Sequence, residues 1–213
     1  MLTVHHLGKS QSERIVWLCE ELGIPYELKN YARDPESMLA PADYKALHPI
    51  GAAPVITEGD VVLAESESIV DYIIARHGNG RLSLPHSDPA YPDYVYWYHF
   101  TNGTLQPGIS RSMLLAWAGL DEKDAIVCAM GERTAMAMKL VNDRLAETKY
   151  LAGEEFTAAD IMIVFSLTTM RYFHPFDLSP YPNILQYLRR IAERPAYQVA
   201  MAKGDPGMPL LLT

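Results

Sequence analysis

The feature that most constrains the fold is the stretch 51–72, which reads GAAPVITEGDVVLAESESIVDY. Pro54 begins its first β-branched run, at a position where the missing N–H removes no hydrogen bond from a sheet. Two short apolar runs, residues 55–57 and 61–63, flank Glu-Gly-Asp, which is typical of a β-hairpin. Ser66 is then a natural N-cap for a helix whose apolar residues recur at helical spacing. The stretch therefore predicts a strand, a turn, a strand and a helix, in that order.

The start of this helix has the chemistry to bind an amino-acid head group. A helix N-terminus offers N–H groups without intrahelical partners and a partial positive charge, so it can hold a carboxylate. Glu65 stands directly before it and can hold an ammonium group. The simpler alternative is that Ser66 only caps the helix and Glu65 is a solvated charge. The adjoining strand that begins at Pro54 favours the binding role.

The residues before this stretch add an opening β-α-β unit. Residues 2–7 and 26–30 read as strands, and the helix between them starts at the capping-box sequence Ser10-Gln-Ser-Glu13 and stops at Gly23. Such a unit requires a right-handed crossover. A short helix is expected over residues 42–47. Together with the hairpin and its helix, the order β-α-β-α-β-β-α is the thioredoxin-like arrangement.

A change of composition separates this unit from the rest of the chain. Three prolines between residues 85 and 92 are typical of a linker. We therefore expect an N-terminal domain over residues 1–80, a linker over 81–90 and a second domain over 91–213.

The second domain is predicted to contain helices and no strands. Residues 161–165 are apolar on all sides, which predicts a buried central helix in a bundle. Residues 204–213 are rich in Gly and Pro and are expected to be irregular. Two long helices are expected over residues 94–117, with an interruption near Gly103 and Pro107, and over residues 122–147. A third helix should start at the capping-box-like sequence Thr157-Ala-Ala-Asp160, and a fourth should cover residues 184–192 and be stopped by Pro195.

Composition excludes several classes of protein. The chain is 49% hydrophobic and 21% charged, as globular proteins are. A net charge of -8 with scattered Lys and Arg argues against nucleic acid or an anionic membrane as a partner. The two cysteines, Cys19 and Cys128, lie far apart, so we expect no disulfide framework, no zinc site and a reducing compartment, the cytoplasm. The N-terminus lacks the pattern of a signal peptide, and no apolar run is long enough to span a bilayer.

Two motifs give the chain a resemblance to a known family. Pro-Val-Ile before the hairpin, and Leu-Ala-Glu-Ser before the amphipathic helix, closely resemble the glutathione-binding half of the soluble glutathione transferases. Residues 153–161 resemble the capping motif of that family's helical domain. The resemblance spans nearly the whole chain. It implies an α/β thioredoxin-like N-terminal domain followed by an all-α helical-bundle domain that contributes the electrophile pocket.

The resemblance also assigns glutathione-binding residues. In the family the strand-opening proline is cis, and the backbone of the preceding residue pairs with the cysteinyl backbone of glutathione, while a Glu-Ser pair grips the γ-glutamyl end. These roles fall on Ala53 and Pro54, and on Glu65 and Ser66. Two departures stand nearby: many relatives carry Lys or Gln where this chain has Ala52, and Glu67 adds an acidic side chain after the usual pair.

A transferase of this family must keep the glutathione thiol ionised, and a hydroxyl at a helix N-terminus can stabilise the thiolate through a charge-assisted hydrogen bond. Ser10 corresponds to the catalytic position of the serine-type branch found in bacteria and fungi. The position of Ser10 is also consistent with a role as a helix cap only, and Ser12 is an alternative candidate both for the cap and for the contact to the sulfur. His6, at the end of the first strand, is the other candidate to contact the sulfur. Cys19 lies on the apolar face of the first helix and is expected to be buried and inert.

The resemblance implies a cytoplasmic homodimeric enzyme of detoxification type. It would use glutathione as co-substrate, without a metal, and join it to small electrophiles. Two alternatives stay open: a non-catalytic, transferase-like binding or regulatory module, and a glutathione-dependent peroxidase or thiol reductase. Large side chains on the first long helix form core in the simplest interpretation, although some could line the second-substrate pocket: Tyr94, Trp97, Tyr98, Phe100, Met113 and Trp117.

Overall fold

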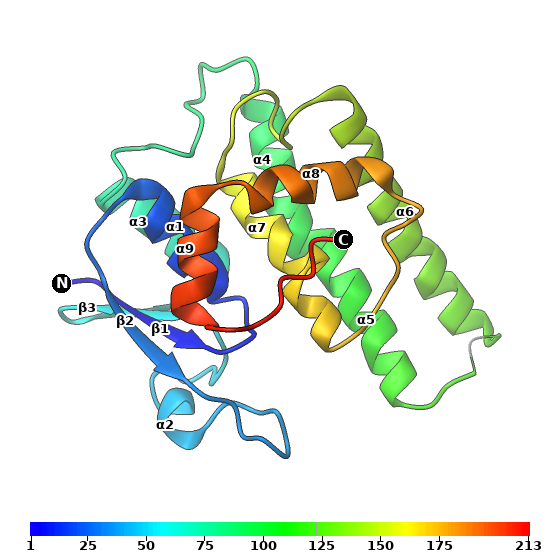
Figure 1. The fold of residues 1–213 in the computed structure, drawn as a ribbon, viewed down its shortest axis with the longest axis horizontal. Helices are drawn as coiled ribbons and strands as arrows, with labels where there is room; N and C mark the ends of the chain where they lie inside the picture. The colour runs from blue at the N-terminus through cyan, green and yellow to red at the C-terminus, as the bar shows by residue number, and fades with distance from the viewer. Residues whose placement is uncertain (122) are drawn as a thin grey trace. The chain divides into compact units, whose positions relative to one another are not determined.

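The computed structural model describes residues 1–121 and 123–213 (Figure 1). The chain divides into two compact units. The first, here the sheet unit, contains Met1–Ser83 and Ile191–Leu210, and the second, the helical unit, contains Leu84–Arg190 and Leu211–Thr213. The expected boundaries place all of residues 91–213 in the helical domain, whereas in the structure Ile191–Leu210 belongs with the sheet.

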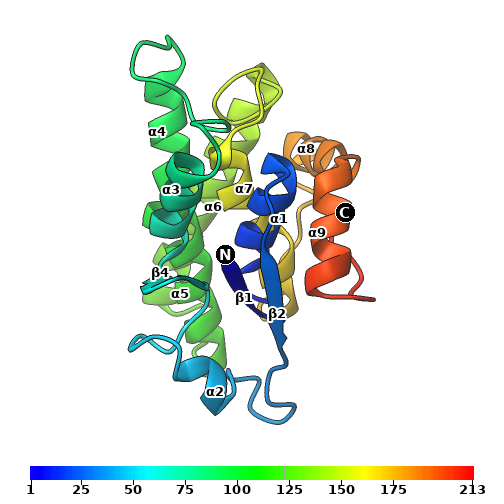
Figure 2. The same cartoon turned by 90° about the vertical axis from the view of Figure 1, so that its left-hand side faces the viewer.

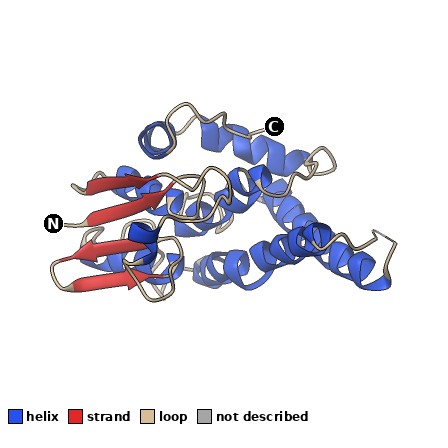
Figure 3. Ribbon diagram, turned by 90° about the horizontal axis from the view of Figure 1, so that it is seen from below, coloured by secondary structure: helices blue, strands red, loops and turns tan. Residues whose placement is uncertain are grey.

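The sheet unit is built on four strands in the order β2-β1-β3-β4 (Figure 3). β1 pairs in parallel with β2, and the antiparallel pairs β1–β3 and β3–β4 complete the sheet. The predicted β-α-β unit and hairpin are therefore confirmed, with strand ends that differ by about one residue. The bounds are Thr3–Leu7 for β1, Glu27–Tyr31 for β2, Val55–Glu58 for β3 and Val61–Ala64 for β4.

Four helices accompany this sheet: α1 (Glu13–Leu22), α2 (Ala42–Lys45), α3 (Ser66–Arg76) and α9 (Pro195–Gly204). As expected, Gly23 ends α1 with a left-handed φ of 61°. Tyr44 of α2 packs in a buried cluster with Leu7, Val55 and Ala64. Because successive side chains of a strand point to opposite faces, His6 lies on the face opposite to Leu7.

Helix α9, which no sequence pattern predicted, lies beside α1 in both views (Figures 1 and 2). Trp17 of α1 and Tyr197 of α9 meet edge to face, with ring centroids 4.9 Å apart. The position of Pro195 in the sequence predicts only a stop after the preceding helix. In the structure it opens α9, since proline in the first turn of a helix costs no hydrogen bond.

Two helix starts differ from the expectation. α1 begins at Glu13 after Ser12, and no side chain caps it, so the capping box expected at Ser10 is wrong. Likewise Ser66 is the first residue of α3 and not its N-cap. The N-cap position belongs to Glu65, which has a positive φ of 72°. Both serine hydroxyls are therefore available for contacts other than capping.

Helices alone form the described part of the helical unit: α4 (Tyr91–Phe100), the π-helix η1 (Thr101–Leu105), α5 (Gln106–Trp117), α6 (Ala125–Glu147), α7 (Ala158–Leu167), the 3₁₀ turn η2 (Thr169–Tyr172) and α8 (Pro182–Ala192). The last two residues of α8 belong to the sheet unit. The interruption predicted near Gly103 and Pro107 is confirmed: η1 contains Gly103, and Pro107 lies in the first turn of α5. Glu122, where the second long helix was expected to begin, lies outside the described residues.

The centre of the helical unit is α7, all of whose residues are buried, as predicted. Its capping box between Thr157 and Asp160 is present. The Asp160 carboxyl also accepts hydrogen bonds from the backbone N–H of Leu151 at 3.0 Å and from the Tyr187 hydroxyl at 3.1 Å. Burial raises the pKa of Asp160 to about 6, against the opposing effect of these donors. None of the described helices is both long enough and apolar enough to cross a membrane.

Candidate functional site

A pocket of about 150 Å³ opens in the sheet unit where β3 begins and β4 ends. Its lining brings together all four residues predicted to bind glutathione, which are Ala53, Pro54, Glu65 and Ser66, with Gln11, Ile50, Ala52 and Ala64. The peptide bond between Ala53 and Pro54 is cis. Segments that are far apart in the sequence thus converge on one small cavity.

Groups of opposite charge lie in the lining of this pocket and directly behind it. The Arg14 guanidinium is fully buried, and its Nη1 donates to Gln11 Oε1 at 2.7 Å and to Ser66 Oγ at 3.2 Å. The N-terminus of α3 adds a partial positive charge at Ser66. Glu65 is exposed, and its left-handed backbone conformation is uncommon for a residue with a side chain. The pocket therefore offers a cationic region and a carboxylate side by side, which suits a zwitterionic head group.

Sequence reasoning did not assign a role to Arg14 or Gln11. The signal was present for Arg14, because a charged residue stands among the apolar positions of α1, directly before Ile15. A buried arginine requires hydrogen-bond acceptors. Only the structure shows that Gln11 and Ser66, at the pocket, are among those acceptors.

Ser10 is buried in the loop between β1 and α1, next in sequence to the pocket residue Gln11. Its Oγ lies 2.7 Å from Ser12 Oγ and accepts a hydrogen bond from the Ser12 backbone N–H at 3.2 Å. Ser12 Oγ in turn accepts from the backbone N–H of Leu7 at 3.1 Å. The two serines that competed for one role are thus hydrogen-bonded to each other.

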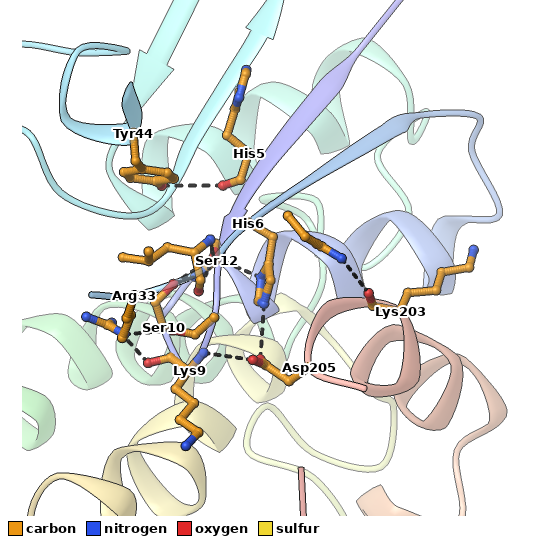
Figure 4. Close-up of polar contacts among 12 residues, drawn as sticks. His5, His6, Lys9, Ser10, Ser12, Arg33, Tyr44, Lys203 and Asp205 are labelled. Carbon is orange, nitrogen blue, oxygen red and sulfur yellow. Dashed lines mark hydrogen bonds and ion pairs between the residues drawn. The ribbon is translucent and has the colours of Figure 1, made fainter. Parts of the chain in front are cut away.

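His6 continues this connection away from Ser10 (Figure 4). Its Nδ1 lies 2.9 Å from Ser12 Oγ, and its Nε2 lies 3.0 Å from Oδ2 of Asp205. The other carboxylate oxygen of Asp205 accepts from the backbone N–H of Lys9 at 2.9 Å. Asp205 follows α9, in a segment predicted only to be irregular, and no local sequence pattern indicated that it reaches β1.

Arg33 holds the same loop from the other side. Its Nε donates to the carbonyl oxygen of Gly8 at 2.7 Å, and its Nη2 donates to that of Lys9 at 3.1 Å (Figure 4). A Cβ on Gly8 would lie 3.1 Å from Oδ1 of Asp205, so the absence of a side chain allows the carboxylate to approach. The loop that carries Ser10 is therefore fixed between Arg33 and Asp205.

Two other candidates take no part in this arrangement. The ring nitrogens of His5 lie 3.0 Å from the Tyr31 hydroxyl and 3.0 Å from Thr57 Oγ1. Cys19 is buried as predicted, and burial raises the pKa of its thiol. Within the described residues, no three His, Cys, Asp or Glu side chains are grouped so that they could hold a metal ion.

The helical unit has a pocket of its own, of about 220 Å³, which lies between α5, α6 and the segment before α8. Ile109, Met138, His174 and Phe176 are among its lining residues. None of the six large side chains that were considered for an electrophile pocket lines it. Four of them, Tyr94, Trp97, Tyr98 and Phe100, are buried. Which residues receive the second substrate stays a prediction.

Sequence comparison and structure comparison both match the chain to glutathione S-transferases. The chain matches the family model of the glutathione S-transferase N-terminal domain over residues 10–76 and that of the C-terminal domain over residues 105–195. It is 30% identical to glutathione S-transferase 3 of Schizosaccharomyces pombe, across 96% of this chain and 88% of the relative. With glutathione S-transferase GstB of Escherichia coli it shares 28% identity, across 86% of this chain and 89% of the relative.

A crystal structure of a glutathione S-transferase from Actinobacillus pleuropneumoniae superimposes with a TM-score of 0.87 at 33% identity, covering 96% of this chain and 93% of that one. The thioredoxin-like sheet unit followed by a helical unit is therefore the fold of these enzymes, as the sequence predicted. The relatives favour neither a non-catalytic binding module nor a specialised peroxidase or thiol reductase. Glutathione is the substrate that the family shares. The chain belongs to the glutathione S-transferase family and is a glutathione transferase.

Proposed function

We propose that the 150 Å³ pocket of the sheet unit binds glutathione and that Ser10 donates a hydrogen bond to its sulfur. The γ-glutamyl carboxylate would lie at Ser66 and the N-terminus of α3, and the ammonium group at Glu65. The backbone of Ala53, before Pro54, would pair with the cysteinyl residue. The observation that carries this proposal is the convergence of these four residues on one cavity lined by Gln11, the neighbour of Ser10.

The charges of the pocket support this orientation. Arg14 stands behind Ser66 with an Nη1–Oγ distance of 3.2 Å, so a carboxylate bound at the hydroxyl gains a nearby cation. Ala52 lines the same pocket and offers no polar side chain to the glycyl end of glutathione. We therefore expect affinity to depend mainly on the γ-glutamyl end.

The serine-type chemistry follows from Ser10. An ordinary thiol has a pKa of about 8.5, and lowering it by one or two units requires roughly 1.4 to 3 kcal/mol. One charge-assisted hydrogen bond together with a helix N-terminus supplies an effect of this size. The thiolate would then attack a small electrophile, in a reaction of detoxification type. We also propose a cytoplasmic homodimer; the absence of a disulfide among the described residues is in keeping with a reducing compartment.

The test of the binding assignment is Ser66→Ala, measured by isothermal titration calorimetry with glutathione. Losing a hydrogen bond to a charged group costs about 1 to 3 kcal/mol, so the dissociation constant should rise roughly five- to 150-fold. Ser68→Ala is the matched control, because Ser68 is an exposed residue of the same helix. An unchanged dissociation constant for Ser66→Ala, in protein with an unchanged melting temperature, would refute the assignment.

A further inference from the structure

The hydroxyl of Ser10 ends an unbroken series of hydrogen bonds that leads to a carboxylate (Figure 4). Ser10 Oγ lies 2.7 Å from Ser12 Oγ, which lies 2.9 Å from His6 Nδ1, and His6 Nε2 lies 3.0 Å from Asp205 Oδ2. Both serines and the histidine are buried, and the Asp205 side chain is only 9% exposed. These four side chains, here called the relay, come from β1, the loop after it and the residue that directly follows α9.

The partners of His6 determine which of its nitrogens carries the hydrogen. The carboxylate of Asp205 can only accept, and its Oδ1 already accepts from the Lys9 backbone N–H. Nε2 of His6 must therefore donate to Oδ2. In the neutral imidazole this leaves Nδ1 as an acceptor, directed at the hydroxyl of Ser12. The neutral relay thus ends, on the side of the serines, in a basic nitrogen that accepts from the Ser12 hydroxyl.

We propose that His6 accepts the proton of the glutathione thiol through Ser10 and Ser12, and that Asp205 stabilises the resulting imidazolium. This inference rests on the proposed contact between Ser10 and the sulfur. In this proposal His6 and Asp205 act on the thiol through the two serines, so they are positioning residues.

The proton transfer balances at every atom. Before it, S–H donates to Ser10 Oγ, Ser10 O–H donates to Ser12 Oγ, and Ser12 O–H donates to His6 Nδ1. The S–H bond breaks and each hydroxyl passes on its own hydrogen as it receives another, until an N–H bond forms at Nδ1. Afterwards His6 is an imidazolium, Ser12 donates to Ser10, and Ser10 donates to the thiolate. No proton leaves the protein.

The rest of the hydrogen-bond network accommodates both states. The backbone N–H groups of Leu7 and Ser12 donate to Ser12 Oγ and Ser10 Oγ respectively, and each hydroxyl oxygen can accept two hydrogen bonds and donate one in either direction. The Leu7 carbonyl oxygen also lies within reach of the Ser12 hydroxyl, but at 3.4 Å it is a more distant acceptor than His6 Nδ1 at 2.9 Å. The transfer therefore leaves the Ser10 hydrogen directed at the sulfur, where a thiolate needs a donor. Imidazole is suited to this role because it exchanges a proton near neutral pH.

The imidazole ring of His6 is closely packed by α9 and paired with a carboxylate. A Cβ on Gly204 would lie 3.1 Å from His6 Nε2, so α9 packs against the ring without an intervening side chain. Asp205 is the charged partner of the ring, and the positive charge of Arg33 acts on Asp205 in turn. Lys203, also on α9, is paired with Glu20 at 2.5 Å.

The experiment counts protons released for each thiolate formed when glutathione binds to the whole enzyme. The thiolate is measured by its ultraviolet absorbance, and the protons are measured by calorimetry in buffers of different ionisation enthalpy, all at one fixed pH near neutrality. S-methylglutathione, which has no thiol, gives the protons exchanged by the other groups of the ligand, and this baseline is subtracted. The ratio does not depend on the fraction of enzyme that is active.

We expect the wild-type ratio to be near zero, because the proton stays on His6. His6→Asn keeps a polar atom near Ser12 but cannot take up a proton, so its ratio should rise to about one proton per thiolate. Asp205→Asn should have the same effect by another route. Since one oxygen is needed by Lys9, the amide nitrogen would face His6 Nε2 and donate to it, which moves the histidine hydrogen to Nδ1 and blocks uptake there.

His5→Asn is the matched control, since it removes the neighbouring histidine, whose pKa is lowered by burial and by Lys29, and should leave the ratio near zero. Ser12→Ala interrupts the relay without altering His6 and should also give a ratio of about one. A wild-type ratio of one, or a ratio that stays near zero in His6→Asn, Asp205→Asn and Ser12→Ala, overturns the relay while the thiolate signal leaves the proposed function in place. Absence of any thiolate signal in the wild type would instead contradict the proposed function itself.

Discussion

His6 Nε2 and Asp205 Oδ2 lie 3.0 Å apart although 199 positions separate the two residues in the chain. His6 is the fourth residue of β1, and Asp205 directly follows α9. The contact exists because α9 packs along α1 and places its C-terminal end beside the end of β1. The segment Ile191–Leu210 therefore packs with the sheet unit and also contributes a side chain, Asp205, to the hydrogen bonds around His6.

We predict that Gly204→Ala destabilises the protein by about 1 to 3 kcal/mol, the usual cost of overpacking. The new Cβ would lie 3.1 Å from Nε2 and 3.2 Å from Cε1 of the His6 ring. The ring cannot move away without losing its contact to Ser12 or Asp205. Urea denaturation followed by circular dichroism measures the change.

Gly131→Ala is the control for this substitution. Gly131 lies inside α6, and a Cβ there would meet nothing within 4 Å. Alanine is favoured over glycine in a helix interior by roughly 1 kcal/mol, so this variant should be at least as stable as the wild type. Equal stabilities for Gly204→Ala and Gly131→Ala would contradict the tight contact at His6.

The buried Asp160 predicts a pH dependence of stability. Its pKa is raised from 3.8 to about 6 in the folded protein, so the folded state disfavours the ionised carboxyl. The contribution of protonated Asp160 to the free energy of unfolding is fully present below the unfolded pKa of 3.8 and is lost as the pH rises through 6. The shift in pKa corresponds to a loss of roughly 3 kcal/mol. Free energies of unfolding measured between about pH 4 and pH 6.5 should show this loss.

Asp160→Asn tests the assignment because asparagine does not titrate. The loss of stability between these pH values should be smaller in the variant than in the wild type. At pH 7 the variant should also be less stable by about 1 to 3 kcal/mol, because one amide cannot accept from both Leu151 N–H and Thr157 N–H. An identical pH profile in the two proteins would assign the titration to another group.

Local patterns predicted those parts of the fold that depend on neighbours in the sequence. The hairpin over β3 and β4, the stop at Gly23 and the capping box at Thr157 each follow from a few adjacent residues, and the structure contains all of them. Ser10 and Ser66 also fitted local capping patterns. There the prediction was wrong because other side chains engage their hydroxyls: Ser12, in the same loop, for Ser10, and the distant Arg14 for Ser66.

The candidate site could be predicted only in part for the same reason. Residues near the Pro54 hairpin were identified because their motif is contiguous. Asp205 and Arg33 reach the loop after β1 from distant segments, and no spacing rule connects them to it. The position of α9 against α1 depends on the packing of whole helices, and a proline followed by ten residues without a clear apolar face gives little local signal of it.

We predict a homodimer whose contacts involve α3, α4, α5 and α6. Large apolar side chains are exposed on α5 and α6 of the single chain, including Trp117, Met136, which is 71% exposed, and Leu140, which is 42% exposed. Met136 and Leu140 are one helical turn apart on α6 and share a face. Light scattering at micromolar concentration should give the mass of a dimer.

The double variant Met136→Lys, Leu140→Lys should shift the protein toward monomer, because two charges would be placed in an apolar contact. Val199→Lys is the matched control: Val199 is 41% exposed on α9, outside the expected interface. A wild-type monomer would contradict the dimer, and dissociation by Val199→Lys alone would place the interface elsewhere.

The last prediction concerns the group that contacts the sulfur. Ser10→Ala removes a donor that stabilises the thiolate more than the thiol, so bound glutathione should ionise at higher pH while binding of the neutral thiol changes little. Losing one charge-assisted hydrogen bond, about 1.5 to 3 kcal/mol, corresponds to roughly a ten- to hundredfold loss in turnover if chemistry limits the rate. The measurements are thiolate absorbance against pH and turnover of an aryl halide.

Ser12→Ala and His6→Phe distinguish Ser10 from its competitors. Ser12→Ala leaves the buried N–H of Leu7 without its hydroxyl acceptor, so it should cost more stability than Ser10→Ala, by about 1 to 3 kcal/mol. Because Ser10 does not cap α1, any stability loss in Ser10→Ala should come only from its contacts with Ser12. If Ser10 is the donor, Ser10→Ala shifts the thiolate titration furthest of the three variants, and the other two shift it less because the Ser10 hydroxyl remains. A titration that moves only in His6→Phe would show that the imidazole, and not Ser10, contacts the sulfur.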